Sequence, residues 1–413
     1  MMTSAPIAST GRAAAILSEA TRELPAPLSV IDLAAFDANG ASMAARAHGH
    51  PIRIATKSLR VRHLLNRALA LEGFQGLMAY SLREALWLVA NGMRDVLVAY
   101  PTVDRGALAE LAAPDNDLAR AEITLMVDCA DHLDIIAAAG PPTPIRVAVD
   151  VDSSLRIFAR TKMPIHVGVR RSPLHTKEDV LAFLDVAQQS TAVHVVGLMF
   201  YDAQIAGLPD SSPAVRIMKK ISRAELAERR LEIASAMRFR LGELDIVNAG
   251  GTGSLHTFDT ATEITEVTAG SGFYHPGLFD GYDHLGLVPS AYFGLDVVRK
   301  PAPGFITAFA GGYVASGQAK QNRQPKLVTP GLLPVGTEGA GEVQTPLRIA
   351  KGAGVKAGTG ISTPGVPQVG ERVWLRGAKA GEQMERFNVT YLLEGGRIVD
   401  NQLTYRGEGK NFG

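Results

Sequence analysis

The sequence has little of what several classes of protein need. Its 413 residues include a single cysteine, Cys129, so no disulfide can form within the chain, which is typical of a reducing compartment. No apolar run approaches the roughly 18 residues of a membrane-spanning helix, and residues 1–20 lack the apolar core of a signal peptide. We therefore expect a cytoplasmic protein that does not enter a membrane.

An excess of charge of one sign is also missing. The 42 lysines and arginines nearly balance the 41 aspartates and glutamates, which leaves a formal net charge of +1. A chain this close to neutral has no overall field that would attract nucleic acid or an anionic membrane, so neither is expected as a partner. The hydrophobic content of 46% is ample for a buried core, and the length allows about two or three domains.

What the sequence does contain is a regular alternation of strand-like and helix-like segments. Apolar strands that alternate with helical patterns are typical of a parallel sheet covered on both faces. Eight such strands favour a closed (β/α)8 barrel of the TIM type over an open sheet. The eight runs are Ile52–Lys57, Gly76–Tyr80, Asp95–Tyr100, Ile123–Asp128, Ile145–Val151, Val193–Tyr201, Asp245–Gly250 and Glu266–Gly270.

The texture of the chain changes after about residue 275. Helical periodicity fades, and glycine, proline and short β-type runs take over, which predicts a second, all-β domain. An earlier strand-like run, Leu28–Leu33, is interpreted as the opening of the barrel region. The expected division is therefore a barrel over residues 28–275 and a β-domain over residues 276–413 together with 1–27. Residues 155–173 lack a helical pattern and are expected to form a long loop at the barrel mouth.

Lys57 is the first candidate for chemistry. It ends the first of the eight runs, and the C-terminal mouth of a barrel strand is where such enzymes keep their active sites. A lysine becomes a useful nucleophile when desolvation or a neighbouring cation lowers its pKa, and Arg53 and Arg60 could supply positive charge. Taken alone, Lys57 fits an ordinary solvent-facing lysine at a strand end at least as well.

A glycine-rich segment, Gly250–Ser254, is the second candidate. It follows the seventh run, and loops after the seventh and eighth strands are where barrels commonly bind phosphate through backbone N–H groups. An ordinary glycine-rich turn is the alternative. No Gly-Lys-Ser/Thr follows as in a Walker motif, and no helical pattern opens there as in a Rossmann fingerprint. A lysine and a phosphate cup that face each other across one barrel mouth suit a phosphorylated aldehyde cofactor.

With these features the chain resembles a known family, the fold-type III pyridoxal-phosphate enzymes. Within it the likeness is to the D-serine dehydratase and D-threonine aldolase branch, whose N-terminal barrel is like that of alanine racemase. The likeness extends over about residues 25–285. The motifs that carry it are Pro27–Asp32, Arg53–Lys57, Gly168–Ser172, Gly197–Tyr201, Gly250–Ser254 and Glu266–Tyr274.

The resemblance implies a role for each matching residue. Lys57 would hold pyridoxal 5′-phosphate as a Schiff base and act as a catalytic base. Arg171, or its neighbour Arg170, would lie near the pyridine ring, and Tyr201 and Tyr274 would line the pocket, with Tyr201 also assigned a catalytic part. The phosphate would be bound by Gly251, Thr252, Gly253 and Ser254.

One departure concerns the metal. Members of the branch that dehydrate D-serine or cleave D-threonine carry a His-x-Cys or His-x-Asp pair that holds a divalent metal. Here Lys379 and Gly381 stand at those positions, so a divalent metal is doubtful and no metal ligand is assigned. Lys379 is interpreted instead as a catalytic acid toward a leaving hydroxyl. Glu382 in that role, or a plain surface loop, are the alternatives.

The resemblance also implies the activity. It indicates a pyridoxal-phosphate-dependent lyase, an aldolase or a dehydratase/deaminase, that acts on small D-configured β-hydroxy amino acids. An amino-acid racemase, a non-catalytic pyridoxal-phosphate-binding protein and a barrel without cofactor are the alternatives. Enzymes of this fold type are typically dimers, so a homodimer is expected.

Overall fold

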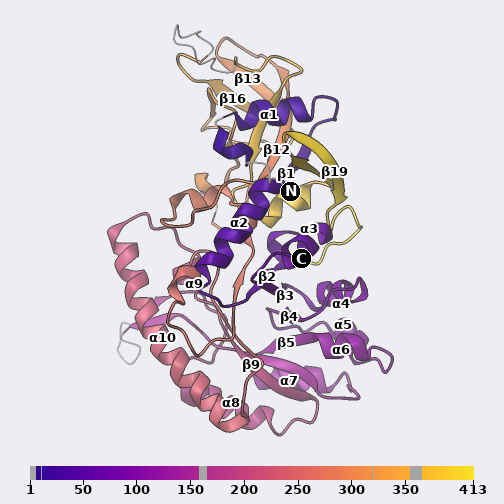
Figure 1. Ribbon diagram of the computed structural model, residues 1–413, viewed down its shortest axis with the longest axis vertical. Coiled ribbons are helices and arrows are strands. Elements are labelled where there is room, and N and C mark those ends of the chain that lie inside the picture. The colour runs from indigo at the N-terminus through magenta and orange to yellow at the C-terminus, as the bar shows by residue number, and fades with distance from the viewer. Residues whose placement is uncertain (1–5, 11, 158–164, 319, 354–364) are drawn as a thin grey trace.

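The computed structural model describes residues 6–10, 12–157, 165–318, 320–353 and 365–413 (Figure 1). Eight parallel strands close into a barrel in the order β10-β11-β2-β3-β4-β5-β6-β9. Each of the eight runs predicted from the sequence is one of these strands, so the (β/α)8 barrel is confirmed. Their bounds are β2 (Ile52–Ala55), β3 (Phe74–Ala79), β4 (Val96–Val98), β5 (Ile123–Val127), β6 (Ile145–Asp150), β9 (Val193–Phe200), β10 (Ile246–Ala249) and β11 (Glu266–Ala269).

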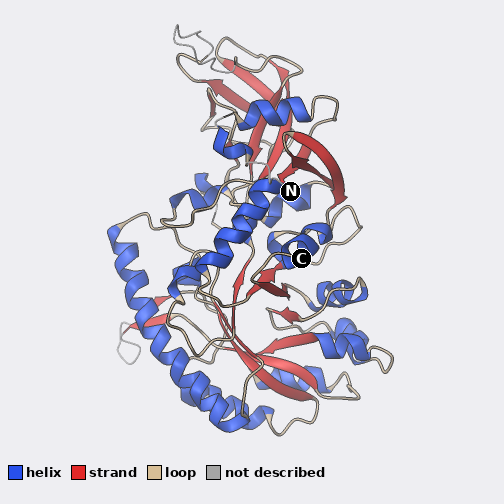
Figure 2. Ribbon diagram, viewed as in Figure 1, coloured by secondary structure: helices blue, strands red, loops and turns tan. Residues whose placement is uncertain are grey.

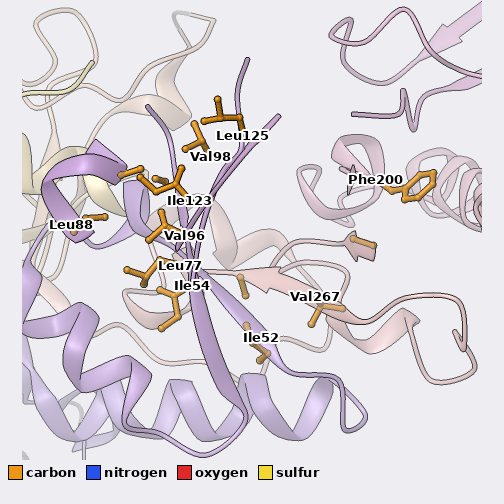
Figure 3. Close-up of a cluster of buried hydrophobic side chains, with 14 of the residues drawn as sticks. Ile52, Ile54, Leu77, Leu88, Val96, Val98, Ile123, Leu125, Phe200 and Val267 are labelled. Atoms are coloured by element: carbon orange, nitrogen blue, oxygen red, sulfur yellow. The ribbon is translucent and has the colours of Figure 1, made fainter. Parts of the chain in front are cut away.

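The barrel strands are apolar throughout because both of their faces are buried. Alternate side chains of a strand point to opposite faces. Leu77, Val96 and Val98 belong to a cluster that packs with helix residues such as Leu88 (Figure 3), whereas Leu97 belongs to a separate cluster inside the barrel. Continuous apolar runs of this kind are the expected pattern for a parallel sheet under helices.

Helices surround the barrel (Figure 2) and begin where the sequence predicts caps. Ser81 accepts from the backbone N–H of Glu84 at the start of α4, and Thr176 and Asp179 form a capping box at the start of α8. The helices are α2 (Leu33–Arg46), α3 (Arg62–Leu69), α4 (Leu82–Ala90), α5 (Arg105–Ala112), α6 (Asp117–Glu122), α7 (Ala130–Ala137), α8 (Lys177–Ala187), α9 (Ala203–Ala206) and α10 (Pro213–Leu241). None of the described helices is both long and apolar enough to cross a membrane.

A closed ionic network fills part of the barrel interior. Arg53 donates from Nε and Nη2 to the two carboxylate oxygens of Glu266, at 2.6 and 2.7 Å, and from Nη1 and Nη2 to Asp95. Asn248 donates to the same Glu266 carboxylate at 2.7 Å. Two carboxylates therefore pair with Arg53, which argues against the expectation that its charge acts on Lys57.

A second, nine-stranded sheet lies above the barrel in the view of Figure 1. The strand at Leu28 belongs here and not to the barrel: β1 runs parallel to β18 and antiparallel to β12. The interpretation that this strand opens the barrel is therefore corrected, and the first barrel strand is β2. The members are β1 (Leu28–Asp32), β12 (Ala291–Arg299), β13 (Phe305–Phe309), β14 (Lys326–Leu327), β15 (Leu332–Pro334), β16 (Gln344–Ile349), β17 (Arg372–Arg376), β18 (Val389–Glu394) and β19 (Arg397–Leu403).

One helix and a pair of short strands lie outside the barrel and the second sheet. Helix α1 (Ala13–Ala20) packs on the second sheet, where the indole N–H of Trp374 donates to the Ser18 hydroxyl at 2.9 Å. The stretch expected to be a loop over residues 155–173 contains an antiparallel pair, β7 (Leu155–Ile157) and β8 (Ile165–Val167). That prediction was wrong for these two strands, whereas residues 168–173 form a loop as expected. Residues 158–164 lie outside the described residues.

Candidate active site

A cavity of about 820 Å³ opens between the barrel mouth and the second sheet. Its walls include the ends of barrel strands, among them Lys57, Tyr100 and Tyr201, and two segments of the sheet region that contain Ser316 and Lys379. This volume lies within the range of about 300–1,000 Å³ that is usual for small-molecule sites. The strand ends position the side chains because each of them leaves the barrel at the same rim.

Lys57 is exposed to this cavity from the short 3-10 turn Thr56–Ser58 that follows β2. Its Nζ donates to the Tyr100 hydroxyl oxygen at 2.7 Å. The sheet region reaches the lysine from above, because a Cβ added at Gly381 would lie 1.8 Å from the Lys57 carbonyl oxygen. A glycine at that point allows the two domains to meet at the reactive residue.

Tyr100 is a residue that the sequence analysis missed. It stands just after β4 (Val96–Val98), at the position in its run that Lys57 and Tyr201 hold in theirs. Burial acts to raise the pKa of Tyr100, but Lys57 and Arg171 outweigh it, and the pKa lies below the ordinary value of a tyrosine. Its position could have indicated Tyr100 from the sequence, because it is the polar residue that ends the apolar run Asp95–Tyr100.

Arg171 and Tyr201 lie where they were predicted, in the cavity wall. The Arg171 guanidinium carbon is 4.9 Å from the Tyr201 ring centroid and 5.5 Å from that of Tyr100. Burial raises the pKa of Tyr201 despite Lys57 and Arg171 nearby. The arginine thus lies against both rings and brings a positive charge to the middle of the site.

The glycine-rich segment forms a tight turn that leaves no room for a side chain at Gly250 or Gly253. Gly250 has a φ of +82°, and a Cβ added at Gly253 would lie 2.3 Å from the Ala206 carbonyl oxygen. Ser254 accepts from the Gly251 N–H at 3.1 Å and closes the turn. Gly250, Gly251 and Thr252 line the cavity, whereas Gly253 and Ser254 are buried behind them and shape the turn.

Tyr274 does not line the cavity as predicted. It is 1% exposed, and its hydroxyl donates to the Leu59 carbonyl oxygen at 2.9 Å beneath the site. Burial raises its pKa. The aromatic side chains that reach the cavity from this part of the chain are Phe279 and Tyr282, and the Tyr282 ring covers the outside of Gly253. No motif in the sequence indicated these two residues.

Lys379 lies in the cavity and not on a plain surface loop. Its Nζ donates to the Ser316 hydroxyl at 2.6 Å and is 3.7 Å from a Glu382 carboxylate oxygen. Glu382 in turn accepts from the Ser316 N–H at 2.8 Å. These contacts hold the ammonium group in one place on the sheet side of the cavity.

The cavity wall is strongly cationic. It contains six basic side chains and one carboxylate, that of Glu382. Such an excess attracts anionic ligands, because a low-dielectric cleft concentrates the field of its charges. The basic residues are Lys57, Arg60, Arg171, Lys320, Arg323 and Lys379.

The Glu382 carboxylate is the one side chain of the described cavity wall that is a common metal ligand. Among the described residues that line the cavity there is no histidine, cysteine or aspartate. Asp128, Cys129 and His132 have ligand atoms within 4.8 Å of one another, but they lie at the start of α7. There the His132 Nδ1 accepts from the Asp128 N–H at 3.3 Å, which is a local contact of the helix start. We assign no metal to this group.

Comparisons with known proteins agree with the fold. A D-threonine aldolase of Arthrobacter sp is 29% identical over 298 residues, which are 69% of this chain and 71% of the relative. The solved D-threonine aldolase of Filomicrobium marinum superposes with a TM-score of 0.75 at 20% identity and covers 93% of this chain and 96% of its own. The D-threo-3-hydroxyaspartate dehydratase of Delftia sp. HT23 gives 0.69 at 20% identity, over 97% and 99%.

A family model, that of the N-terminal domain of alanine racemase, matches residues 31–276. The matched region contains all eight barrel strands, Lys57 and the glycine-rich turn. Because it amounts to more than half of the chain, the protein belongs to the alanine racemase N-terminal domain family.

Proposed function

We propose that this protein is a pyridoxal 5′-phosphate-dependent lyase that acts on small D-configured β-hydroxy amino acids, as an aldolase or as a dehydratase/deaminase. The observation that carries the proposal is the placement of the Lys57 amine and the Gly250–Thr252 turn in the wall of one cavity. The D-threonine aldolases and the D-threo-3-hydroxyaspartate dehydratase to which the chain is similar support it.

The residues present fit this cofactor. A phosphate group carries a charge of about −2 and has acceptor oxygens, so it suits a glycine-rich turn in a cationic wall. Gly251 keeps that turn open, since an added Cβ would lie 2.8 Å from the Ala206 Cβ. An exposed lysine amine in the same cavity can bond to an aldehyde. When bound, pyridoxal phosphate supplies an electron sink for charge that develops on an amino acid.

The roles of this chain's residues follow from their places. Lys57 would hold the cofactor, and its Nζ would take the proton from the substrate Cα in a dehydratase. Arg171, against the Tyr100 and Tyr201 rings, binds and orients the ring of the bound group. In a dehydratase, Lys379, which Ser316 and Glu382 hold in place, would give a proton from its Nζ to the leaving β-hydroxyl oxygen. The Lys379 ammonium would thus assist the departure of the β-hydroxyl, as a metal ion would in other members of the branch. In an aldolase the β-hydroxyl would instead have to lose its proton.

Colour and product analysis test the proposal. Purified protein mixed with pyridoxal phosphate should gain a visible absorption band, and Lys57→Ala should lack it. Lys379→Ala is the matched control: a second lysine of the same cavity is removed, so the band should remain while lyase activity falls. A wild-type protein that gains no band contradicts the proposal.

The racemase alternative is separated by its product. D-serine or D-threonine should yield a keto acid or an aldehyde plus glycine, whereas a racemase would return the other enantiomer of D-alanine. Lys379 alone does not separate the two activities, because in a racemase it would be the acid–base group on the face of Cα opposite Lys57. A non-catalytic carrier would show the band and give no product.

We also propose a homodimer as the working assembly. Three exposed apolar side chains lie in the sheet region, at Phe309, Val314 and Val343. The Ala310 N–H donates to the Val343 carbonyl, so these segments are neighbours. A second copy that covers them would remove apolar surface from water. Sedimentation should give a dimer, and Val314→Asp with Val343→Asp should give a monomer.

A further inference from the structure

Lys57 has an unusual partner for a lysine. Its Nζ donates to a phenol oxygen, that of Tyr100, at 2.7 Å. In the part of the chain that the structure describes, no ion pair joins Lys57 to a carboxylate, and the one carboxylate of the cavity, Glu382, is already held by Ser316 and Lys379. A protonated amine has no lone pair and cannot attack an aldehyde, so Lys57 needs a proton acceptor within reach. Tyr100 is the group in that position.

The surroundings of Tyr100 suit a phenolate. The titratable groups that face it are Lys57 after β2, Arg171 in the segment before α8, and Tyr201 after β9. Two of the three are cations, and their attraction outweighs burial, so the pKa of Tyr100 is lowered.

The other tyrosines differ from Tyr100 in this respect. Burial raises the pKa of seven of the nine, and these include Tyr201, although the same Arg171 lies against its ring. A cation near the ring is therefore not enough. What distinguishes Tyr100 is that both cations hydrogen-bond to its side chain, with Lys57 Nζ 2.7 Å from its hydroxyl oxygen, whereas Tyr201 has neither hydrogen bond.

We propose that Tyr100 is a catalytic residue whose phenolate takes the proton from Lys57 Nζ and so makes the lysine a nucleophile. The N–H bond of the ammonium breaks and an O–H bond forms on the phenol, which leaves a neutral amine with its lone pair beside a neutral tyrosine. No other acid or base is consumed. The inference rests on the proposed function in one respect, that Lys57 is the residue that bonds the cofactor.

The first test uses the protein freed of cofactor and follows phenolate absorbance in the near ultraviolet as the pH is raised. One tyrosine should ionise before the others. Tyr100→Phe should remove this early component, and Lys57→Met should move it to higher pH. Tyr201→Phe is the control that keeps Arg171 against a ring, and it should leave the early component in place. An early component that survives Tyr100→Phe overturns the proposal.

The second test measures how fast the same cofactor-free protein captures pyridoxal phosphate, from the growth of the visible band. At neutral pH Tyr100→Phe should capture it roughly 100-fold more slowly, which is a usual worth for one acid–base group, and the rate should recover as the pH rises. The final extent should equal that of wild type, because Lys57 and the glycine turn are intact. Equal rates at every pH overturn the proposal.

The two tests separate this inference from the proposed function. If wild type captures no pyridoxal phosphate, the proposed function fails, yet the titration still decides whether Lys57 and Tyr100 share a proton. If wild type and Tyr100→Phe both capture it at the same rate, the proposed function stands and the role of Tyr100 falls.

Discussion

Replacing Arg53 by methionine should destabilise the barrel strongly. Arg53 and Glu266 are 2% and 3% exposed and are joined by two hydrogen bonds of 2.6 and 2.7 Å. Removing one partner of a buried ion pair leaves the other charge without compensation, which costs about 3–5 kcal/mol. Asp95 adds little to this loss because its side chain is half exposed and water can solvate it. We therefore expect the free energy of unfolding to fall by about 3–5 kcal/mol, as measured by urea unfolding.

Two further variants make the measurement decisive. Arg53→Met combined with Glu266→Gln should recover much of the loss, because a buried pair removed as a unit is often close to neutral and Asn248 keeps an amide oxygen to donate to. Arg83→Met breaks the exposed pair with Asp104 and should cost no more than about 1 kcal/mol. An Arg53→Met variant as stable as Arg83→Met would refute the reasoning.

The same variant also decides what Arg53 does for Lys57. Glu266 and Asp95 neutralise Arg53 in the structure, so the folded Arg53→Met protein should capture pyridoxal phosphate at the wild-type rate. The interpretation from the sequence, in which Arg53 supplies a cation that activates Lys57, requires a slower rate.

Three other predictions follow from single contacts. Burial raises the pKa of Glu84 to about 7 from its ordinary value of 4.5. The stability that the protonated Glu84 contributes is therefore complete below pH 4.5 and is lost as the pH rises through about 7. Glu84→Gln should flatten the decline of the melting temperature with pH across this range. Gly253→Ala places a Cβ 2.3 Å from the Ala206 carbonyl oxygen, and the strain of about 1–3 kcal/mol should weaken pyridoxal phosphate binding by calorimetry roughly tenfold or more. Lys379→Met should slow loss of the β-hydroxyl by about 100-fold or more, and chelation with EDTA should leave the wild-type rate unchanged.

The barrel could be predicted from the sequence because its strands are buried on both faces, and the resulting apolar runs are separated by helical patterns. The same signal misled the analysis at β1, whose five residues are all buried. A buried strand shows that both its faces are covered but not which strands it pairs with. That choice depends on β12 and β18, which come more than 250 residues later in the sequence.

The site was predictable where it follows from strand ends. Lys57, Arg171 and Tyr201 share the cavity wall with Gly251 and Thr252, as the sequence and the family resemblance indicated. What was predicted about their roles stays a prediction. The prediction that Tyr274 lines the cavity failed because the chain turns after β11, and the Tyr274 side chain contacts Leu59 instead of entering the cavity. Side-chain direction in such a turn depends on packing that the sequence pattern does not encode.

Arg53 and Lys57 show why depth in the barrel, more than residue type, decides reactivity. They are basic residues four positions apart at one strand. In the barrel interior a charge without a partner costs too much free energy, so Arg53 is paired with two carboxylates and is not available to bind a ligand. At the mouth water reaches the side chain, and Lys57 can stand beside a phenol with no carboxylate to hold its proton. The barrel thus pairs Arg53 with carboxylates where desolvation demands it and leaves Lys57 without an ion pair to a described carboxylate where water reaches it.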